Sequence, residues 1–411
     1  MAETASLFDD TENPFFPATR AHAQMRIEAF KPSMGSTYAS KRNYDLGPGQ
    51  HDYVSQLSPF IRHRLITEQE VAQAALSRFA FSTAEKFVQE VYWRTYFKGW
   101  LERHPSVWRR YVSARDEALS DLSGGRKTAY EKAIGGKSGI EPFDFWVREL
   151  IDTGYLHNHA RMWFASIWVF TLDLPWVLGA DFFHRHLLDG DAASNTLSWR
   201  WVAGLHTKGK NYAARSSNIK KYTDDRFGNI HGLAQDPAPL EDEWNGAADD
   251  APSILPQSLS GDTLLLLHED DLGVESLPLG DASIVAAAVY ADPAARSKGE
   301  VGELVHQFTD EAVDDTCARL KDARGVEAKA VAAIDQIIAA AKDSGASQIV
   351  MPYVPSGPAS DALSGLKREA EDAGLSLHVV QRSHDRDAWP HCAKGFFGLK
   401  KKIPDLIEPG A

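Results

Sequence analysis

A polar stripe runs along a helix pattern that is otherwise too apolar to face water. Asn158, Arg161 and Met162 stand at positions i, i+3 and i+4, so they share one face of that helix. A guanidinium on a mostly buried helix needs a partner, and a loop further along the chain offers the carboxylates of Asp189 and Asp191. The residues alone leave two interpretations open. They predict either an aromatic core with a satisfied ion pair or a pocket for a polar ligand.

A second stripe combines a carboxylate, an indole and a guanidinium on one helix face. It consists of Glu90, Trp93, Arg94 and Phe97, at i, i+3, i+4 and i+7. Spacing alone is compatible with a surface ion pair beside a core tryptophan. The alternative is one wall of a binding pocket.

Small hydroxyl side chains precede a predicted helix start near residue 58. Ser55 and Ser58, with Leu57 between them, can present Oγ atoms and backbone N–H groups to an anion, assisted by the helix dipole. A serine in this position is also an ordinary N-cap. The segment therefore predicts either an anion-binding loop or a plain helix cap.

Helix patterns fill the first half of the chain and would position these residues. Nine of the eleven tryptophans lie between Trp93 and Trp201, and strand signals are scarce before residue 235. Ser82 or Thr83, followed by Glu85, predicts a capped start for one of the helices. The predicted helices cover residues 68–79, 82–102, 142–153, 155–172 and 180–188. This half is predicted to be all-α.

The composition changes after residue 235. Residues 236–261 are rich in Pro, Asp, Ala and Ser, which is typical of a linker. Beyond it, predicted strands alternate with predicted helices, which indicates a Rossmann-like parallel α/β sheet. The strands are 263–268, 283–290, 349–353 and 376–380, and the helices are 299–323, 328–344 and 360–373. We expect a multidomain α and α/β protein, with an all-α domain over 1–235, a linker over 236–261 and an α/β domain over 262–411.

Charge and cysteine content restrict the function classes. The net charge is −13, yet residues 1–235 hold 29 Lys and Arg against 26 Asp and Glu, so the first half can carry a basic groove. Two cysteines cannot supply the four thiolates of an iron–sulfur cluster. The start of the chain lacks a secretory pattern, and no apolar run approaches the length of a membrane helix. These features predict a soluble, cytoplasmic protein.

The same segments resemble the DNA photolyase/cryptochrome family. The resemblance rests on TGYLHNHARM and LLDGDAASNTLSWRW in the centre, on YASKRN and VSQLSP near the N-terminus, and on EVYWR between them. It implies a photolyase-type domain that binds flavin adenine dinucleotide (FAD), and no metal ligands are expected. The residues that it places at FAD are Tyr38, Ser55, Leu57, Ser58, Arg94, Asn158, Arg161, Asp189, Asp191 and Asn195.

The resemblance also implies roles within this set. Ser55, Leu57 and Ser58 would hold the FAD diphosphate. Arg161 and Asp189 would form an ion pair against the flavin ring, where a guanidinium stabilises an anionic reduced flavin. Asn195 would face the reactive ring nitrogen, and an asparagine at that position favours repair chemistry.

The activity implied by the resemblance is that of a deoxyribodipyrimidine photolyase, a lyase. Reduced flavin would pass an electron, driven by blue light, to a cyclobutane pyrimidine dimer flipped out of UV-damaged DNA. Residues expected to contact the dimer are Glu90, Trp93, Asn158, Met162 and Trp201. Trp199 and Trp176 would return electrons to the flavin. Candidates for an outermost electron-transfer residue are Trp100, Trp108, Tyr130 and Trp146.

Several departures from the family pattern keep other functions open. Val54 replaces a hydroxyl residue, Phe87 replaces a tryptophan beside the flavin, and an unusual basic loop follows Trp201. That loop is either a DNA phosphate contact or a solvated surface. The alternative function is a cryptochrome-like blue-light photoreceptor that signals to a protein partner without repair. A flavoprotein without photochemistry is a third.

The second half resembles the α/β domain of the same family in a different chain position. TLLLLHEDDLG looks like the opening strand of that domain and WPHCAKGFFGLKKKIP like its closing segment. In the family this domain normally precedes the flavin domain, so the resemblance implies a circular permutation. It also implies a seat for a second, antenna chromophore whose identity the sequence does not reveal.

Overall fold

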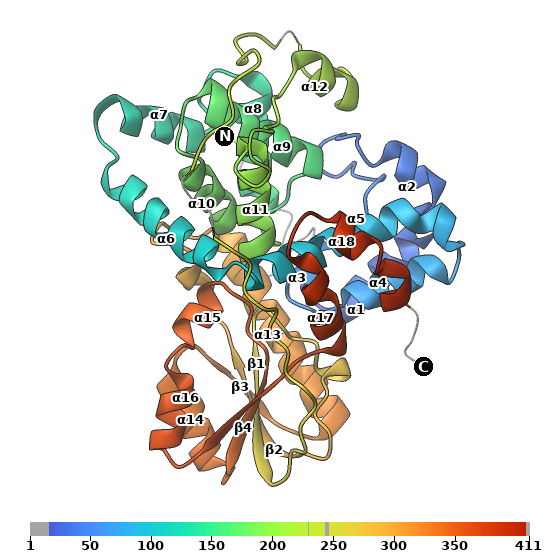
Figure 1. The fold of residues 1–411 in the computed structure, drawn as a ribbon, viewed down its shortest axis with the longest axis vertical. Coiled ribbons are helices and arrows are strands. Elements are labelled where there is room, and N and C mark those ends of the chain that lie inside the picture. The colour runs from blue at the N-terminus through green and yellow to red at the C-terminus, as the bar shows by residue number, and fades with distance from the viewer. Residues whose placement is uncertain (1–15, 229, 243–245, 408–411) are drawn as a thin grey trace, which may run out of the picture.

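Twelve α-helices form the part of the chain up to residue 242 that the structure describes (Figure 1). The computed structural model describes residues 16–228, 230–242 and 246–407. Residues 16–228 and 230–242 contain no strand, so the all-α prediction is confirmed for them. The helices are α1 (Arg20–Phe30), α2 (Ser36–Lys41), α3 (Ser58–Arg62), α4 (Glu68–Leu76), α5 (Phe81–Glu102), α6 (Pro105–Ser120), α7 (Gly124–Ile134), α8 (Glu141–Thr153), α9 (Asn158–Ser166), α10 (Trp176–His186), α11 (Ala192–Ala203) and α12 (Ser216–Tyr222).

The helix that carries the polar stripe begins at Asn158 and continues beyond α9 as a π-helical turn, Ile167–Thr171. His157 precedes α9 as its N-cap, and its Nδ1 accepts the backbone N–H of His159 at 3.1 Å. In the turn, the N–H of Leu172 bonds to the carbonyl of Ile167 at 2.9 Å. Such i→i+5 turns shift the register of a helix face and occur often at functional sites.

The predicted cap at Ser82 or Thr83 is wrong. Helix α5 begins at Phe81, and its N-cap is Ala80, which offers no side-chain hydrogen bond. The carbonyl of Ala80 accepts the N–H of Thr83 at 2.9 Å, so the first turn closes before a hydroxyl could cap it. The described chain has its capping box one helix earlier, where Thr67 and Glu70 satisfy each other's backbone N–H groups at the start of α4.

The second half is a five-stranded parallel sheet with the order β3-β2-β1-β4-β5. The strands are β1 (Asp262–His268), β2 (Ser283–Tyr290), β3 (Ala328–Val331), β4 (Gln348–Pro352) and β5 (Ser376–Val380). The side chains of β1 alternate between two cores, so Leu264 and Leu266 face α14 (Ile334–Asp343) and α16 (Leu366–Asp372). Leu265 and Leu267 join the core of α13 (Glu303–Arg324), which is continuous with that of the helical half. A Rossmann-like α/β fold is confirmed.

Two helix predictions in this half need correction. Residues 328–331 were expected to begin a helix, but they form the edge strand β3, paired with Ala287–Tyr290 of β2. Ala and Lys have low strand propensity, so tertiary pairing decides the outcome there. The helix expected over residues 360–373 is divided into α15 (Pro358–Ala362) and α16, with Gly365 at the N-cap of α16.

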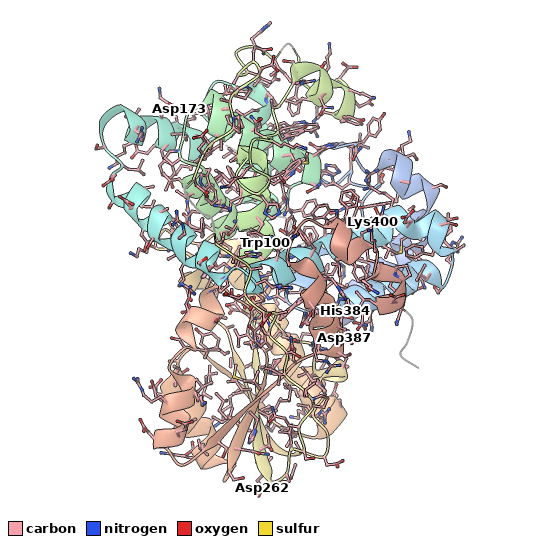
Figure 2. All side chains as sticks on the ribbon, in the orientation of Figure 1. Trp100, Asp173, Asp262, His384, Asp387 and Lys400 are labelled. Carbon is pink, nitrogen blue, oxygen red and sulfur yellow. The ribbon has the colours of Figure 1, made fainter. Side chains whose placement is uncertain are left out.

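The carboxyl ends of the strands point toward the helical half. Figure 2 shows Asp262, at the start of β1, at the far end of the sheet and His384 near the junction of the two halves. At that junction Arg64 lies between Asp271 and Asp385, with N–O distances of 2.9 and 2.6 Å. None of the helices in the described residues is long and apolar enough to cross a membrane.

The last part of the chain returns to the helical half (Figure 1). This C-terminal segment, residues 383–407, contains α17 (Ser383–Ala388), α18 (Phe397–Lys400) and α19 (Ile403–Ile407). It packs so closely on α5 that a Cβ added at Gly99 would lie 2.6 Å from Cδ1 of Trp389. The predicted domain division places this segment with the sheet. We propose instead that residues 383–407 complete the helical unit.

Candidate functional site

The buried carboxylate of Asp189 in the helical half forms ion pairs with two guanidinium groups. Asp189 Oδ1 lies 2.9 Å from Nη1 of Arg161, and Asp189 Oδ2 lies 3.5 Å from Nη2 of Arg94. Burial raises the pKa of Asp189, but the two guanidinium groups and a hydrogen bond from the Ser58 hydroxyl outweigh burial and lower it. The structure thus joins the polar stripe of α9, the stripe of α5 and the hydroxyl segment before α3 around one carboxylate.

Asp191, two residues after Asp189 in the same loop, is also bound by neighbouring donors. It is the N-cap of α11, where its Oδ1 accepts the N–H of Ser194 at 2.7 Å. Its Oδ2 lies 3.8 Å from Nζ of Lys98, one helical turn beyond Arg94. Burial raises the pKa of Asp191, yet Lys98 and Arg94 prevail and lower it to about 2. Both acids of the loop are therefore ionised at neutral pH.

Several buried donors around this loop lack a hydrogen-bond acceptor within the protein. They are Arg94 Nη1, Lys98 Nζ, Ser194 Oγ, Thr196 Oγ1 and Trp199 Nε1. Unpaired buried donors are costly, so their concentration here fits a ligand rich in acceptor atoms. FAD, with its diphosphate and ring carbonyl groups, has that character. The side chain of Asn195 donates from Nδ2 to the carbonyl of Ala180 at 2.7 Å, which leaves its Oδ1 for a ligand N–H.

The aromatic residues expected near FAD also come together. The ring of Tyr38 meets that of Phe87 edge to face, with centroids 5.0 Å apart. Phe87 is buried on α5, so it retains the apolar role of the tryptophan that it replaces. Leu57 is buried at the N-cap of α3, while Ser55 and Ser58 are half-buried. Their predicted contact with a diphosphate stays a prediction.

Two of the residues expected to contact a dimer reach the surface of the protein. Asn158 is exposed, Met162 is half-buried, and Trp201 is 37% exposed and stacked on Tyr212 at 5.7 Å. Glu90 pairs with Lys86 at 2.8 Å. These side chains remain candidates for substrate contact.

Trp93, also on this list, is half-buried under the C-terminal segment. Its ring lies parallel to that of Phe396, with centroids 4.1 Å apart and an angle of 12° between the planes. The sequence gives no signal for this contact because the two residues lie in different halves of the chain.

Aromatic rings extend from both predicted electron-transfer residues. Trp199 is buried and lies 6.2 Å from Trp168. Trp176 contacts Tyr111 at 5.8 Å, and Tyr111 contacts Trp108 at 5.4 Å. Of the four candidates for the outermost residue, Trp108 is thus connected to Trp176 through Tyr111, and Tyr130 is connected to Trp199 through Trp168, with Tyr130 and Trp168 6.0 Å apart. Tyr111 was not among the residues that the sequence suggested, although it stands at i+3 from Trp108 and shares its helix face.

Arg62 connects the loop of Asp189 and Asp191, called the ligand loop below, to the strand ends of the sheet. Its Nε donates to the carbonyl of Gly190 at 3.1 Å, between the two loop acids. Its other nitrogens pair with Glu269 at 3.1 Å and Asp270 at 2.5 Å, directly after β1. In open α/β sheets a ligand binds where the strand order reverses, here between β1 and β4. Next to that point the space beyond β1 is taken by Arg62, so a second chromophore has to lie elsewhere on the sheet or displace this contact.

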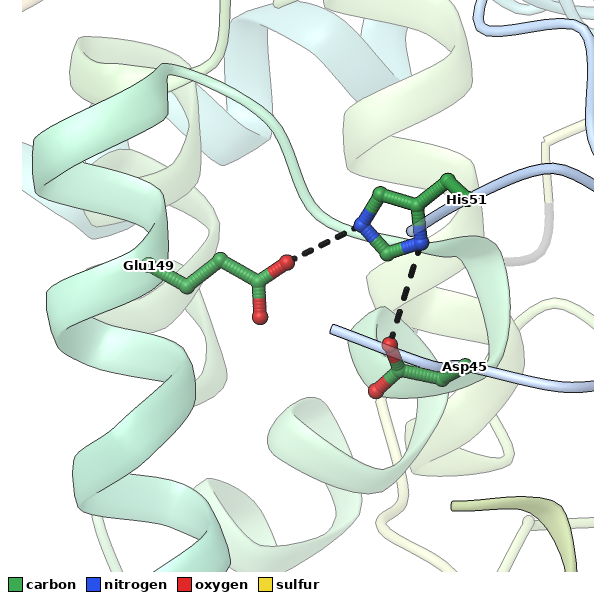
Figure 3. Close-up of side chains that lie close together, drawn as sticks. All are labelled: Asp45, His51 and Glu149. Carbon is green, nitrogen blue, oxygen red and sulfur yellow. Dashed lines mark hydrogen bonds and ion pairs between the residues drawn. The ribbon is translucent and has the colours of Figure 1, made fainter. Parts of the chain in front are cut away.

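A buried His–Asp–Glu cluster was missed by the sequence analysis (Figure 3). His51 Nε2 lies 3.1 Å from Oε1 of Glu149, and His51 Nδ1 lies 3.9 Å from Oδ1 of Asp45. These are metal-ligand types, and one ligand atom of each residue lies within 4.8 Å of the other two, while the imidazole turns one nitrogen toward each carboxylate. Asp45 Oδ2 already accepts Trp146 Nε1 at 3.1 Å and pairs with Arg226 at 2.9 Å. The cluster thus ties the segment around residues 45–51 to α8.

The fold and the site together define a helical half whose buried, unpartnered donors suit an acceptor-rich ligand, joined to a Rossmann-like sheet. Residues 87–226 match the family model of the FAD binding domain of DNA photolyase. The match covers 140 of the 411 residues, all of them in the helical half, so this part of the chain is similar to a photolyase-type FAD-binding domain.

Curated relatives match this half of the chain. A deoxyribodipyrimidine photo-lyase of Streptomyces griseus is 31% identical over 182 residues, which are 41% of this chain and 39% of that protein. A cryptochrome DASH of Natronomonas pharaonis is 28% identical over 193 residues, 46% of this chain and 40% of that protein. The match thus spans about two fifths of the length of these relatives. Among solved structures, a cryptochrome of Synechocystis sp. PCC6803 aligns with a TM-score of 0.43 and 20% identity over 54% of this chain and 46% of that one.

Proposed function

We propose that this protein is a light-dependent FAD flavoprotein that repairs cyclobutane pyrimidine dimers, a deoxyribodipyrimidine photolyase-like lyase. The observation that carries the proposal is the convergence of Arg161 and Arg94 on Asp189, with Asn195 Oδ1 free beside them. FAD, when bound, supplies the one-electron chemistry.

The chain's own residues contribute charge, orientation and exclusion of water. Arg94 and Arg161 create a positive potential around the ligand loop, which favours an anionic ring system. The ionised Asp189 holds both guanidinium groups in place, so the local potential does not depend on mobile side chains. Asn195 can accept a hydrogen bond from the ligand at Oδ1 because its Nδ2 donates to the carbonyl of Ala180. Trp199, fully enclosed by aromatic neighbours, keeps water away from that side.

UV-damaged DNA is the proposed substrate. Trp93 and Trp201 would stack on the extruded dimer, while Glu90, Asn158 and Met162 would contact its edges. Base–aromatic stacking contributes about 1–3 kcal/mol per base, which is enough to offset the cost of extruding a damaged, poorly paired base. Trp199 and Trp176 are proposed to return electrons to the flavin, with Tyr111 and Trp108, both buried on α6, as an extension of the path from Trp176.

A repair assay tests this proposal. Reduced protein is illuminated with blue light in the presence of an oligothymidylate that contains one cyclobutane dimer, and intact thymines are measured by chromatography. Loss of dimer is expected under light and not in the dark. Unchanged dimer in the light, with protein that has retained its flavin, would reject the repair activity. A Trp201→Ala variant, altered at an exposed residue expected to contact the dimer and not the flavin, should retain flavin and repair more slowly.

The second candidate function is a cryptochrome-like photoreceptor with a protein partner. It is favoured by the stacking of Phe396 on Trp93, which covers a surface that a dimer would use. Light-driven reduction of the flavin without repair, blocked in a Trp199→Phe variant, would support it. Absence of photoreduction in the wild-type protein would instead support a flavoprotein without photochemistry.

A further inference from the structure

The C-terminal segment places an aromatic ring where the proposed function needs a nucleobase. The rings of Phe396 and Trp93 lie nearly parallel with centroids 4.1 Å apart, which is the separation of stacked aromatic groups. Phe396 is only 7% exposed. A nucleobase cannot stack on this face of Trp93 while Phe396 occupies it.

The segment is anchored on both sides of Phe396. Before it, Trp389 and Cys392 are fully buried against Gly99 of α5. After it, Leu399 and Ile403 are fully buried. Such anchors hold the segment on the helical half, so any movement that frees Trp93 has to be confined to the short stretch between them.

That short stretch contains a point of backbone freedom. A Cβ at Gly395 would have no atom within 4 Å, and its φ lies outside the left-handed region, so neither packing nor backbone conformation requires glycine there. Gly398 is different, because a Cβ at that position would lie 2.8 Å from the carbonyl oxygen of His391. Gly398 fits the close packing of the segment, whereas Gly395 adds conformational freedom directly beside Phe396.

Exposed cations surround the same stretch. Lys394, Lys401 and Lys402 are exposed, and Lys394 also anchors the loop because its carbonyl accepts the Tyr96 hydroxyl at 2.7 Å. Lysines at such positions attract nucleic-acid phosphates. A DNA backbone held there would bring its bases to the edge of the Phe396–Trp93 stack.

We infer that Phe396 is a gate: it occupies the stacking face of Trp93 in the free protein, and an extruded base has to displace it. The inference rests on the proposed function, since it assumes that Trp93 receives a base. It assigns to the C-terminal segment a role in substrate entry and predicts that the gate lowers the affinity for a dimer.

The test compares Phe396→Ala with Phe397→Ala. Phe397 is the adjacent residue and is 75% exposed, so its truncation is a matched control. Binding of a fluorescent oligothymidylate with one dimer is measured by anisotropy in the dark, beside the undamaged oligonucleotide. Because one aromatic stack is removed, Phe396→Ala should bind the dimer about threefold to tenfold more tightly than wild type. Phe397→Ala should match wild type.

A second variant guards against a folding defect. Phe396→Leu retains apolar volume but cannot stack, so it should shift the affinity in the same direction, with an unchanged flavin content and melting temperature. Suppose that wild type prefers damaged over undamaged DNA but that both Phe396 variants bind the dimer no more tightly than wild type. The gate would then be refuted, and the proposed substrate would stand. If wild type and both variants bind the two oligonucleotides equally, the proposed substrate is wrong and the gate falls with it.

Discussion

Replacing Asp189 by asparagine removes the charge around which the candidate site is organised. The Asp189 side chain is 2% exposed and faces two guanidinium groups, at 2.9 Å for Arg161 and 3.5 Å for Arg94. Loss of one partner from a buried pair costs about 3–5 kcal/mol, because the remaining charge is left uncompensated. Arg161 retains some access to water, with 23% of its side chain exposed, and an asparagine Oδ1 can still accept its hydrogen bond. We therefore expect a loss of about 3 kcal/mol in the free energy of unfolding, at the lower end of that range.

The assay combines urea denaturation with flavin content. Wild-type and Asp189→Asn proteins are compared for unfolding free energy and for FAD released per chain on denaturation. The matched control is Asp173→Asn, an exposed acid of the same half whose φ of 50° asparagine tolerates well. The control should behave as wild type, whereas Asp189→Asn should lose stability and flavin together. An Asp189→Asn protein with wild-type stability and full flavin content would refute the assignment of this carboxylate as the centre of the site.

Three further results are expected. Burial lowers the pKa of three histidines, to about 3, 4 and 4 for His157, His186 and His206. In the unfolded chain these histidines bind a proton near pH 6.5, whereas in the folded chain they do so only at lower pH. Their contribution to the unfolding free energy should therefore be at its maximum above pH 6.5. It should then fall on acidification by up to about 1.4 kcal/mol per pH unit for each histidine, and a flat denaturation series between pH 7 and 5 would contradict this. Arg62→Ala should leave Asp270 without its cation and Glu269 with the more distant Arg296, at 3.7 Å, and should lower the unfolding free energy by about 3 kcal/mol, whereas equal urea midpoints would argue against the tie between loop and sheet. Trp108→Phe should slow the reduction of oxidised flavin under continuous blue light, followed by absorbance, relative to Trp100→Phe. Equal rates in the two variants would remove Trp108 from the electron path.

The elements of the site were predictable from local sequence patterns. Arg161 and Asp189 could be paired because a guanidinium on an apolar helix requires an anion, and the acids of the next loop were the available ones. Helix faces came from the 3.6-residue period, which places Glu90 with Arg94 and Asn158 with Arg161 on one face of their helices. The parallel sheet followed from apolar runs such as residues 263–268, which are buried on both faces.

What the sequence could not provide were contacts between distant segments. Strand β3 escaped prediction because its four residues, Ala328–Val331, acquire strand conformation by pairing with β2. The stack of Phe396 on Trp93 joins residues about 300 positions apart, and no periodic pattern encodes such a pair. The His51 cluster escaped for the same reason, since Asp45 and His51 meet Glu149, 98 positions beyond His51, only in the folded chain.

The most direct test of the central claim is the cofactor itself. Protein purified under non-denaturing conditions should be yellow or, when reduced, convertible to a yellow form, and denaturation should release FAD at close to one molecule per chain. The Asp189→Asn variant should release less under the same conditions. A colourless wild-type preparation that releases no flavin, and takes up none when refolded with FAD, would contradict the account at its base.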